Sequence, residues 1–425
     1  MKASEIKSAV CSGALNKYTH IYADVAKESE RIAKLADGFI AMYGDKEALL
    51  LSVPGRSEIL GNHTDHNNGC VLAGAIDRDV IAIAAKNSDG TVRFYSEGYP
   101  LSTVEISKCD SPDNFEKYTS SALIGGMVNG FKKRGYTVGG FDAYSDSEVL
   151  KGSGISSSAA YEVMIGNILN HLYLNGEVDN EEIAKLAQYS ENVFFGKPSG
   201  LMDQMACAVG GFVFIDFEDN KNPKVEPIDF SLTDKGYALA IINTGGNHAD
   251  LNDDYASVPA EMKAVATAFG QSTLRGLCEA DIFSKAKELR ERVGDRAILR
   301  AVHFIRENAR VCCAKDALQS GDLLRFLDTV TASGASSFKY LQNVYTNLNV
   351  KEQGLSLALS IADGYLEGKT GAHRVHGGGF AGTVQVFVKK EDLPGLTERM
   401  TAIFGTDSVM SLSIRPLGAV KIDFE

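Results

Sequence analysis

A glycine- and serine-rich segment, Gly152-Ser-Gly-Ile-Ser-Ser-Ser158, stands immediately before a run of helical periodicity. The N-terminus of a helix exposes unpaired backbone N–H groups and carries partial positive charge, which together favour a phosphate group. Glycine lets the backbone approach such a ligand, and serine hydroxyls can bind phosphate oxygens or ligate magnesium. We therefore predict a phosphate-binding loop made by Gly152, Ser153, Gly154, Ile155, Ser156, Ser157 and Ser158. Serines that only cap the helix are the plainer alternative.

Two acidic residues farther along the chain stand where a carboxylate could do chemistry. Glu191 follows Ile183 and Ala187 at steps of four, so it shares the apolar face of a predicted helix. A buried carboxylate needs a cation or hydrogen-bond donors, and the partner is either a lysine or a magnesium ion. Asp203 is a lone acid in a stretch that stays uncharged through Phe214. It is either a partly buried catalytic group or an acid that only stabilises a helix N-terminus.

Histidines gather in one loop, where His63, Asp65 and His66 could hold a metal ion. The rest of the chain has no second cluster with metal-ligand spacing except His373 and His376. We therefore favour a polar loop that binds hydroxyl groups, and a self-bonded surface turn is the plainer alternative.

Strands and helices must position these groups. Strand-like runs are predicted at residues 48–53, 71–76, 80–85, 212–217, 237–242, 383–388 and 420–424. Helices are predicted over the first 45 residues, at 158–172, at 181–193, near 203–209, and through most of 253–364. The polar stretch 219–227 contains two prolines and is the candidate domain boundary. We expect one domain over residues 1–222, with extra N-terminal helices, and another over 223–425.

Composition excludes several classes of protein. The chain of 425 residues has 43 basic and 55 acidic side chains, a formal charge of −12, so neither nucleic acid nor an anionic membrane is an expected partner. The seven cysteines include no CxxC pair, which predicts neither a disulfide framework nor a thiolate zinc site. No apolar run approaches the roughly 20 residues of a membrane span. We expect a cytoplasmic monomer that acts on small molecules.

Four segments, in this order, resemble the motifs of the GHMP small-molecule kinases, and in particular of the branch that phosphorylates galactose. Residues 54–69 read PGRSEILGNHTDHNNG and resemble the pattern GRxNxIGEHTDYNxG. Residues 151–159 read KGSGISSSA and resemble GxGLSSSA. Residues 194–204 read FFGKPSGLMDQ and match FxGxPxGxMDQ. Residues 375–382 read VHGGGFAG and resemble the third family motif.

The resemblance implies an α+β fold of two domains. It implies an N-terminal mixed α/β domain with ribosomal-protein-like topology, a C-terminal α+β domain, and an active site in the cleft between them for ATP and a sugar. Asp203 would be the catalytic base with Arg56 beside it, and Ser158 and Glu191 would ligate Mg²⁺. The segment Gly152–Ser158 would bind the ATP phosphates. The sugar would be contacted by Asn62, His63, Asp65, Gly200 and Tyr255.

The implied reaction is transfer of a phosphoryl group from ATP to the anomeric hydroxyl of a monosaccharide, D-galactose to galactose 1-phosphate. The first motif departs from its pattern, with Asn62 in place of a glutamate, Glu58 in place of an asparagine and His66 in place of a tyrosine. These departures leave open a kinase for another sugar, such as N-acetylgalactosamine or arabinose. A regulator that binds galactose and ATP without catalysis is the other alternative.

Overall fold

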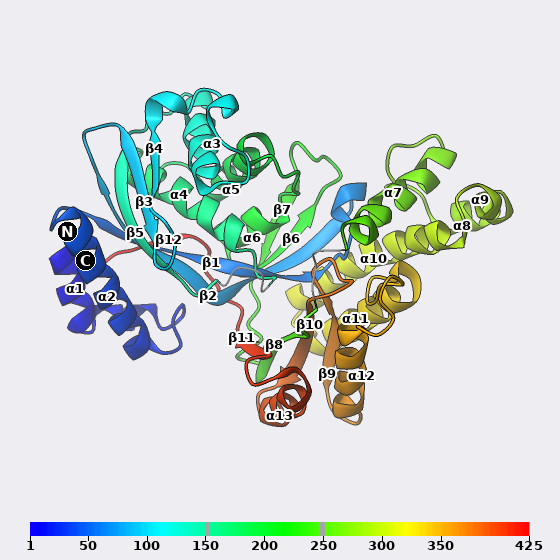
Figure 1. Cartoon of the computed structure of the whole chain (residues 1–425). Helices are drawn as coiled ribbons and strands as arrows, with labels where there is room; N and C mark the ends of the chain where they lie inside the picture. The colour runs from blue at the N-terminus through cyan, green and yellow to red at the C-terminus, as the bar shows by residue number, and fades with distance from the viewer. Residues whose placement is uncertain (150–153, 247–250, 425) are drawn as a thin grey trace. The chain divides into compact units, whose positions relative to one another are not determined.

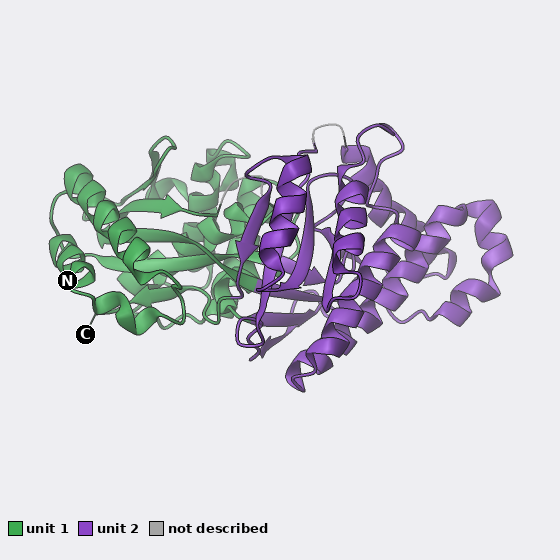
Figure 2. Ribbon diagram, turned by 90° about the horizontal axis from the view of Figure 1, so that it is seen from below, with its two compact units in different colours: residues 1–56, 75–211, 415–425 green, residues 57–74, 212–414 purple. Residues whose placement is uncertain are grey.

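The computed structural model describes residues 1–149, 154–246 and 251–424, which fall into two compact units (Figure 2). Unit 1 comprises residues 1–56, 75–211 and 415–425, and unit 2 comprises residues 57–74 and 212–414. The chain first enters unit 2 within one long strand, β1 (Leu49–Leu60), and returns within another, β2 (Cys70–Lys86). It crosses again after residues 211 and 414. The units therefore interleave in the sequence, whereas the predicted division at residue 222 separates two consecutive stretches. Both units mix helices and strands, which confirms the predicted α+β class.

Unit 1 is built on a sheet whose main path has the strand order β12-β1-β2-β5-β3-β4 (Figure 1). Its further strands are β3 (Thr91–Ser96), β4 (Ser102–Glu105), β5 (Phe141–Ser147) and β12 (Val420–Ile422). Its helices are α1 (Ala3–Cys11), α2 (Val25–Tyr43), α3 (Ser120–Lys133), α4 (Ser157–Tyr173), α5 (Asn180–Tyr189) and α6 (Met202–Val209). Strand β5 pairs antiparallel with β2 and parallel with β3. The C-terminal strand β12 pairs antiparallel with β1.

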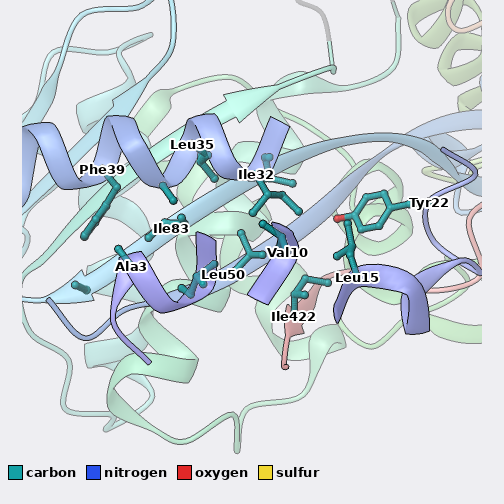
Figure 3. Packing of buried hydrophobic residues seen from close by; sticks show 14 of the residues in the cluster. Ala3, Val10, Leu15, Tyr22, Ile32, Leu35, Phe39, Leu50, Ile83 and Ile422 are labelled. Atoms are coloured by element: carbon teal, nitrogen blue, oxygen red, sulfur yellow. The ribbon is translucent and has the colours of Figure 1, made fainter. Parts of the chain in front are cut away.

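The helices of unit 1 cover both faces of this sheet. Helices α1 and α2 pack on one face through a buried apolar cluster that includes Leu35, Phe39, Leu50 and Ile83 (Figure 3). On the opposite face, the Phe94 ring of β3 contacts the Tyr161 ring of α4, with 4.8 Å between ring centroids. Both faces of the sheet are therefore covered, and since successive side chains of a strand point to opposite faces, the apolar residues of β2 are buried on both. The first 45 residues are thus mainly helical and integral to the core.

A buried ion pair explains the one strand that the sequence divided in two. The predicted strands 71–76 and 80–85 are a single strand, β2, which runs without a break through the polar residues between them. The Asp79 carboxylate is buried and accepts hydrogen bonds from Arg31 at 2.6 Å and Arg415 at 3.2 Å. Burial acts to raise the pKa of Asp79, but the two arginines hold it below its usual value. A polar interruption here marks a buried charge rather than a turn.

Unit 2 contains a four-stranded antiparallel sheet with the order β11-β8-β10-β9. Its strands are β8 (Tyr237–Asn243), β9 (Gly371–His376), β10 (Thr383–Lys389) and β11 (Val409–Leu412). Its helices are α7 (Asn252–Ala268), α8 (Glu279–Ser284), α9 (Ala286–Arg292), α10 (Asp295–Gln319), α11 (Leu323–Ser336), α12 (Gly354–Leu366) and α13 (Leu393–Phe404). Helices α12 and α13 pack with Val384, Val386 and Val388 on one face of the sheet. On the other face, Phe387 contacts Phe326 of α11.

Unit 2 also contains β6 (Phe212–Asp216) and β7 (Lys224–Ile228). Strand β6 pairs with residues 70–74 of β2 and with β7. Part of the stretch 219–227, the candidate domain boundary, is therefore strand. Pro227 is tolerated because β7 is an edge strand that pairs with β6 alone among the described strands. The predicted strand 48–53 is present but longer, because β1 continues to Leu60. The remaining predicted strands and the helices at 158–172, 181–193 and 203–209 are present within a few residues of their expected bounds.

The sequence predicted neither a disulfide framework nor a membrane-spanning segment. All seven cysteines are free thiols. Within the described ranges, no helix has the length and apolar character needed to cross a bilayer.

Candidate active site

The start of helix α4 carries the predicted phosphate loop. Gly152 and Ser153 lie outside the described residues, while Gly154 and Ile155 lead into α4. Ser156 is the N-cap residue of α4 and has a left-handed backbone, with φ of 62°. Its hydroxyl does not cap the helix but donates to Asp203 Oδ2 at 2.6 Å. The Ser156 side chain thus leaves the first N–H groups of α4 available to a ligand, against the plainer alternative of a simple capping serine.

Arg56 and Asp203 form a two-pronged ion pair within unit 1. Arg56 Nε donates to Asp203 Oδ1 at 2.7 Å, and Nη2 donates to Oδ2 at 2.6 Å. Arg56 also holds the phosphate loop, because its Nη1 donates to Gly154 O at 2.6 Å and its backbone N–H donates to Ile155 O at 3.1 Å. The strand and loop approach so closely that a Cβ on Gly55 would lie 2.8 Å from Ile155 O. One guanidinium thus fixes both the carboxylate and the loop.

The surroundings of Asp203 determine its protonation state. Burial acts to raise the pKa of Asp203, but the charge and hydrogen bonds of Arg56, with the Ser156 hydroxyl, lower it below the usual value. Asp203 is therefore ionised at neutral pH, in the first turn of α6. An ionised carboxylate beside a helix N-terminus can accept the proton of a hydroxyl group that reacts at a phosphate.

Glu191 lies in a π-helical turn, Ser190–Phe195, that continues helix α5. Its side chain is buried, as the spacing from Ile183 predicts. Lys197 Nζ lies 3.1 Å from Glu191 Oε1, and Gln204 Nε2 donates to Oε2 at 2.8 Å. The lysine partner, one of the two alternatives raised from the sequence, is therefore present. Since the Lys197 side chain is 56% exposed, it can swing into solvent and leave that oxygen to another cation.

A second buried carboxylate beside Glu191 escaped the sequence analysis. Glu162 lies on α4 one turn after Ser158 and is fully buried. Gln204 Nε2 donates to its Oε2 at 3.2 Å, while its Oε1 has no hydrogen-bond partner. Burial, and then the charge of Glu191, raise the pKa of Glu162 well above its ordinary value. The sequence does contain a sign of this residue, because Glu162 is an acidic residue in a mainly apolar helix that follows the serine-rich loop.

The oxygen atoms around Glu191 are of the types that bind a magnesium ion. Hydroxyl, carboxylate and amide oxygens are the hard ligands that Mg²⁺ prefers. The orphaned oxygen of Glu162 and the unfavourable approach of two buried carboxylates, which raises the pKa of Glu162, are what a divalent cation would relieve. Among the described residues, no three His, Cys, Asp or Glu side chains come together as a metal site. A magnesium ion here would therefore also take hydroxyl, phosphate or water oxygens.

The predicted sugar-binding residues of unit 2 meet at two loops. His63 Nε2 lies 2.9 Å from Gly378 O, and the Tyr255 hydroxyl donates to Gly379 O at 2.6 Å. A Cβ on Gly378 would lie 2.7 Å from the Tyr255 ring, so the glycine motif lets its loop pack against these side chains. Asp65 opens a short 3₁₀ turn just after His63. The structure thus brings the first and third motifs together.

The remaining predicted sugar contacts are placed differently. Asn62 is buried at 1% exposure, with its side chain bonded inside unit 2. Gly200 is an exposed residue of unit 1, close in sequence to Asp203. The roles of both residues as sugar ligands stay predictions.

These motifs on this fold define a GHMP kinase. The family model "GHMP kinases N terminal domain" matches residues 122–211, and "Galactokinase galactose-binding signature" matches residues 37–86. A curated galactokinase of Streptomyces coelicolor is 30% identical over 376 residues, which cover 87% of this chain and 92% of the relative. The chain belongs to the galactokinase family, and it is a sugar kinase.

Solved structures agree with this assignment at the level of the fold. Lactococcus lactis galactokinase in complex with galactose superposes with a TM-score of 0.77 at 24% identity, over 92% of this chain and all of that one (100%). Methanococcus jannaschii mevalonate kinase superposes with a TM-score of 0.60 at 15% identity, over 87% of this chain and 98% of that one. The predicted two-domain GHMP kinase fold is confirmed.

A buried histidine supports the loop that carries His63. His303 Nε2 lies 3.0 Å from Asn62 O, and its Nδ1 lies 2.9 Å from Ser336 Oγ. Because a carbonyl oxygen only accepts, Nε2 carries the proton, and Nδ1 is the acceptor of a neutral ring. Burial lowers the pKa of His303 from 6.5 to about 4.

We predict that His303 makes stability fall as the pH drops from about 6.5 to about 4. In this window the unfolded chain binds a proton that the folded chain does not, which costs at most about 1.4 kcal/mol per pH unit. The His303→Gln variant should show a shallower loss of unfolding midpoint in urea between pH 7 and pH 5. The exposed His20→Gln variant is the control and should follow the wild type. Equal pH dependence in all three proteins would contradict the burial of a neutral His303.

Proposed function

We propose that this chain transfers the γ-phosphoryl group of ATP to the anomeric hydroxyl of D-galactose and releases galactose 1-phosphate. The observation that carries the proposal is the carboxylate of Asp203, held ionised by Arg56 at the start of α6 and bonded to the serine that begins α4. A proton acceptor and a phosphate-binding helix start are thus joined by direct contacts. The names of the Streptomyces and Lactococcus relatives support galactose as the sugar.

The proposed chemistry follows from how phosphoryl groups transfer. The transition state is loose, so catalysis depends on positioning and on neutralising charge on the transferring oxygens. The N–H groups at the start of α4, in the loop Gly152–Ser158, would hold the ATP phosphates. Asp203 would take the proton from the sugar hydroxyl as it attacks, while Arg56 keeps the carboxylate ionised and in place.

We propose that Ser158 and Glu191 hold Mg²⁺, with Glu162 and Gln204 completing the polar surroundings of Glu191. The ion, when bound, neutralises charge on the ATP phosphates. Gln204 contacts both glutamates through one amide nitrogen, so it sets the spacing of the two carboxylates. Without a bound cation, the ammonium group of Lys197 pairs with the Glu191 carboxylate from the exposed side.

We propose that His63, Asp65, Gly200 and Tyr255 contact the sugar. Hydrogen bonds from such groups to ring hydroxyls reject a sugar with a misplaced hydroxyl, because buried polar atoms are then left unpaired. The intact bonds among Arg56, Asp203 and Ser156 argue against a regulator that lacks catalysis. A monomer in the cytoplasm completes the proposal, since seven free cysteines suit a reducing compartment.

A substrate panel tests the proposed function. We predict that ADP release requires a sugar and is fastest with D-galactose, and that glucose is poorer by orders of magnitude because one hydroxyl is inverted. The panel comprises galactose, 6-deoxygalactose, N-acetylgalactosamine, arabinose and glucose. A clear preference for a sugar other than galactose would exclude the substrate but keep the class, whereas no sugar-dependent turnover would exclude the function.

The proposed magnesium role of Glu191 has its own test. Glu191→Gln removes the charge and keeps the shape, so we predict that the Mg²⁺ concentration for half-maximal turnover rises and that kcat falls. Affinity for sugar without nucleotide should stay within about twofold, because no sugar contact changes. Lys197→Gln is the matched control and should leave the Mg²⁺ requirement at or below that of the wild type. Superimposable Mg²⁺ titrations of Glu191→Gln and wild type would contradict the magnesium role and leave Glu191 as a structural partner of Lys197 and Gln204.

A further inference from the structure

The side-chain amide of Asn62 has no hydrogen-bonding capacity left for a ligand. Its Nδ2 donates to Glu58 Oε1 at 3.0 Å and to Gly377 O at 2.7 Å. Its Oδ1 accepts from Asn343 Nδ2 at 2.7 Å and from Ser337 Oγ at 3.4 Å. An amide offers two donors and two acceptor positions, and all four are used. Asn62 can therefore bind a sugar hydroxyl only by breaking an internal bond.

The orientation of this amide follows from its neighbours. A carboxylate and a carbonyl oxygen only accept hydrogen bonds, so Glu58 and Gly377 face the nitrogen of Asn62. The Asn343 amide nitrogen, which also donates to Gly378 O at 3.0 Å, faces its oxygen. The charge of Glu58 is compensated, because the buried Arg374 guanidinium lies 3.4 Å from the same carboxylate oxygen.

The Asn62 amide joins two loops of unit 2. One is the segment that carries His63 and Asp65, and the other is the glycine segment after β9, reached through Gly377 and, by way of Asn343, through Gly378. The His63 ring also contacts Gly378 O. A change at Asn62 would therefore shift a whole group of side chains.

We propose that Glu58 and Asn62 are an exchanged pair that positions the His63–Asp65 loop, and that Asn62 itself does not contact the sugar. The motif pattern has an amide at position 58 and a carboxylate at position 62, and this chain has the reverse. The direct bond between the two side chains makes the two departures one coupled change. The part that concerns the sugar rests on the proposed function, whereas the pairing does not.

The contacts explain why each change alone is unfavourable. Asn62→Glu with Glu58 in place would bury two carboxylates together and turn an acceptor toward Gly377 O. Glu58→Asn alone would remove the counter-charge of the buried Arg374. Making both changes restores one amide and one carboxylate that can bond to each other.

A double-mutant cycle in thermal unfolding tests the pairing without any substrate. We predict that the Tm loss of Glu58→Asn/Asn62→Glu is clearly smaller than the sum of the losses of the two single variants, because contacting residues couple. Ser337→Ala, which removes only the 3.4 Å contact, is the control and should change Tm little. Additive losses would overturn the exchanged pair.

A second double-mutant-type cycle, in which Asn62 and the hydroxyl groups of the sugar are changed separately and together, tests the positioning role. Asn62→Ala and the milder Asn62→Asp are assayed with galactose and with galactose lacking one hydroxyl at a time. A positioning residue acts through several side chains at once, so kcat/KM should fall by about 10- to 100-fold with galactose and no single deoxy-sugar should escape the loss, with KM for ATP unchanged. If one deoxy-sugar escapes the loss, Asn62 contacts that hydroxyl and the positioning role is overturned. If the wild type phosphorylates no sugar, the proposed function fails, and the Tm cycle still decides the pairing.

Discussion

The bond between Arg56 and Asp203 is the interaction on which the rest of the candidate active site depends. Three elements meet at it, because β1 supplies Arg56, α6 supplies Asp203, and Ser156 at the start of α4 bonds to the same carboxylate. A half-buried carboxylate without a cation would tend to take up a proton and could not act as a base. The guanidinium keeps it ionised and also holds the carbonyl of Gly154, so charge state and loop position are set together.

The same strand that carries Arg56 continues into the sugar-binding motif. Glu58 follows two residues later in β1, and its bond to Asn62 begins the network that includes Asn343 and the glycine loop. Both networks pair one carboxylate with one arginine, the half-buried Asp203 with Arg56 and the buried Glu58 with Arg374. Polar groups at this density are stabilising only when nearly all are paired, which supports the proposal that the departures at Glu58 and Asn62 are coupled.

The sequence predicted what depends on periodicity and local motif, and it missed what depends on contacts between distant residues. The burial of Glu191 followed from its spacing to Ile183. The continuity of β2 did not, because the buried partners of Asp79 lie far away in the chain, at Arg31 and Arg415. The role of Asn62 was interpreted from its position in a motif, whereas its hydrogen bonds to Gly377 and Asn343 could be seen only after folding.

The central claim is that the Asp203 carboxylate accepts the proton of the sugar hydroxyl, and turnover of Asp203→Asn tests it most directly. The amide keeps the size and cannot take the proton, so kcat should fall by about 10²–10⁴-fold while ATP binding, followed by fluorescence or calorimetry, stays near that of the wild type. A folded variant that binds ATP and turns over at a near-normal rate would contradict the assignment of Asp203 as the base.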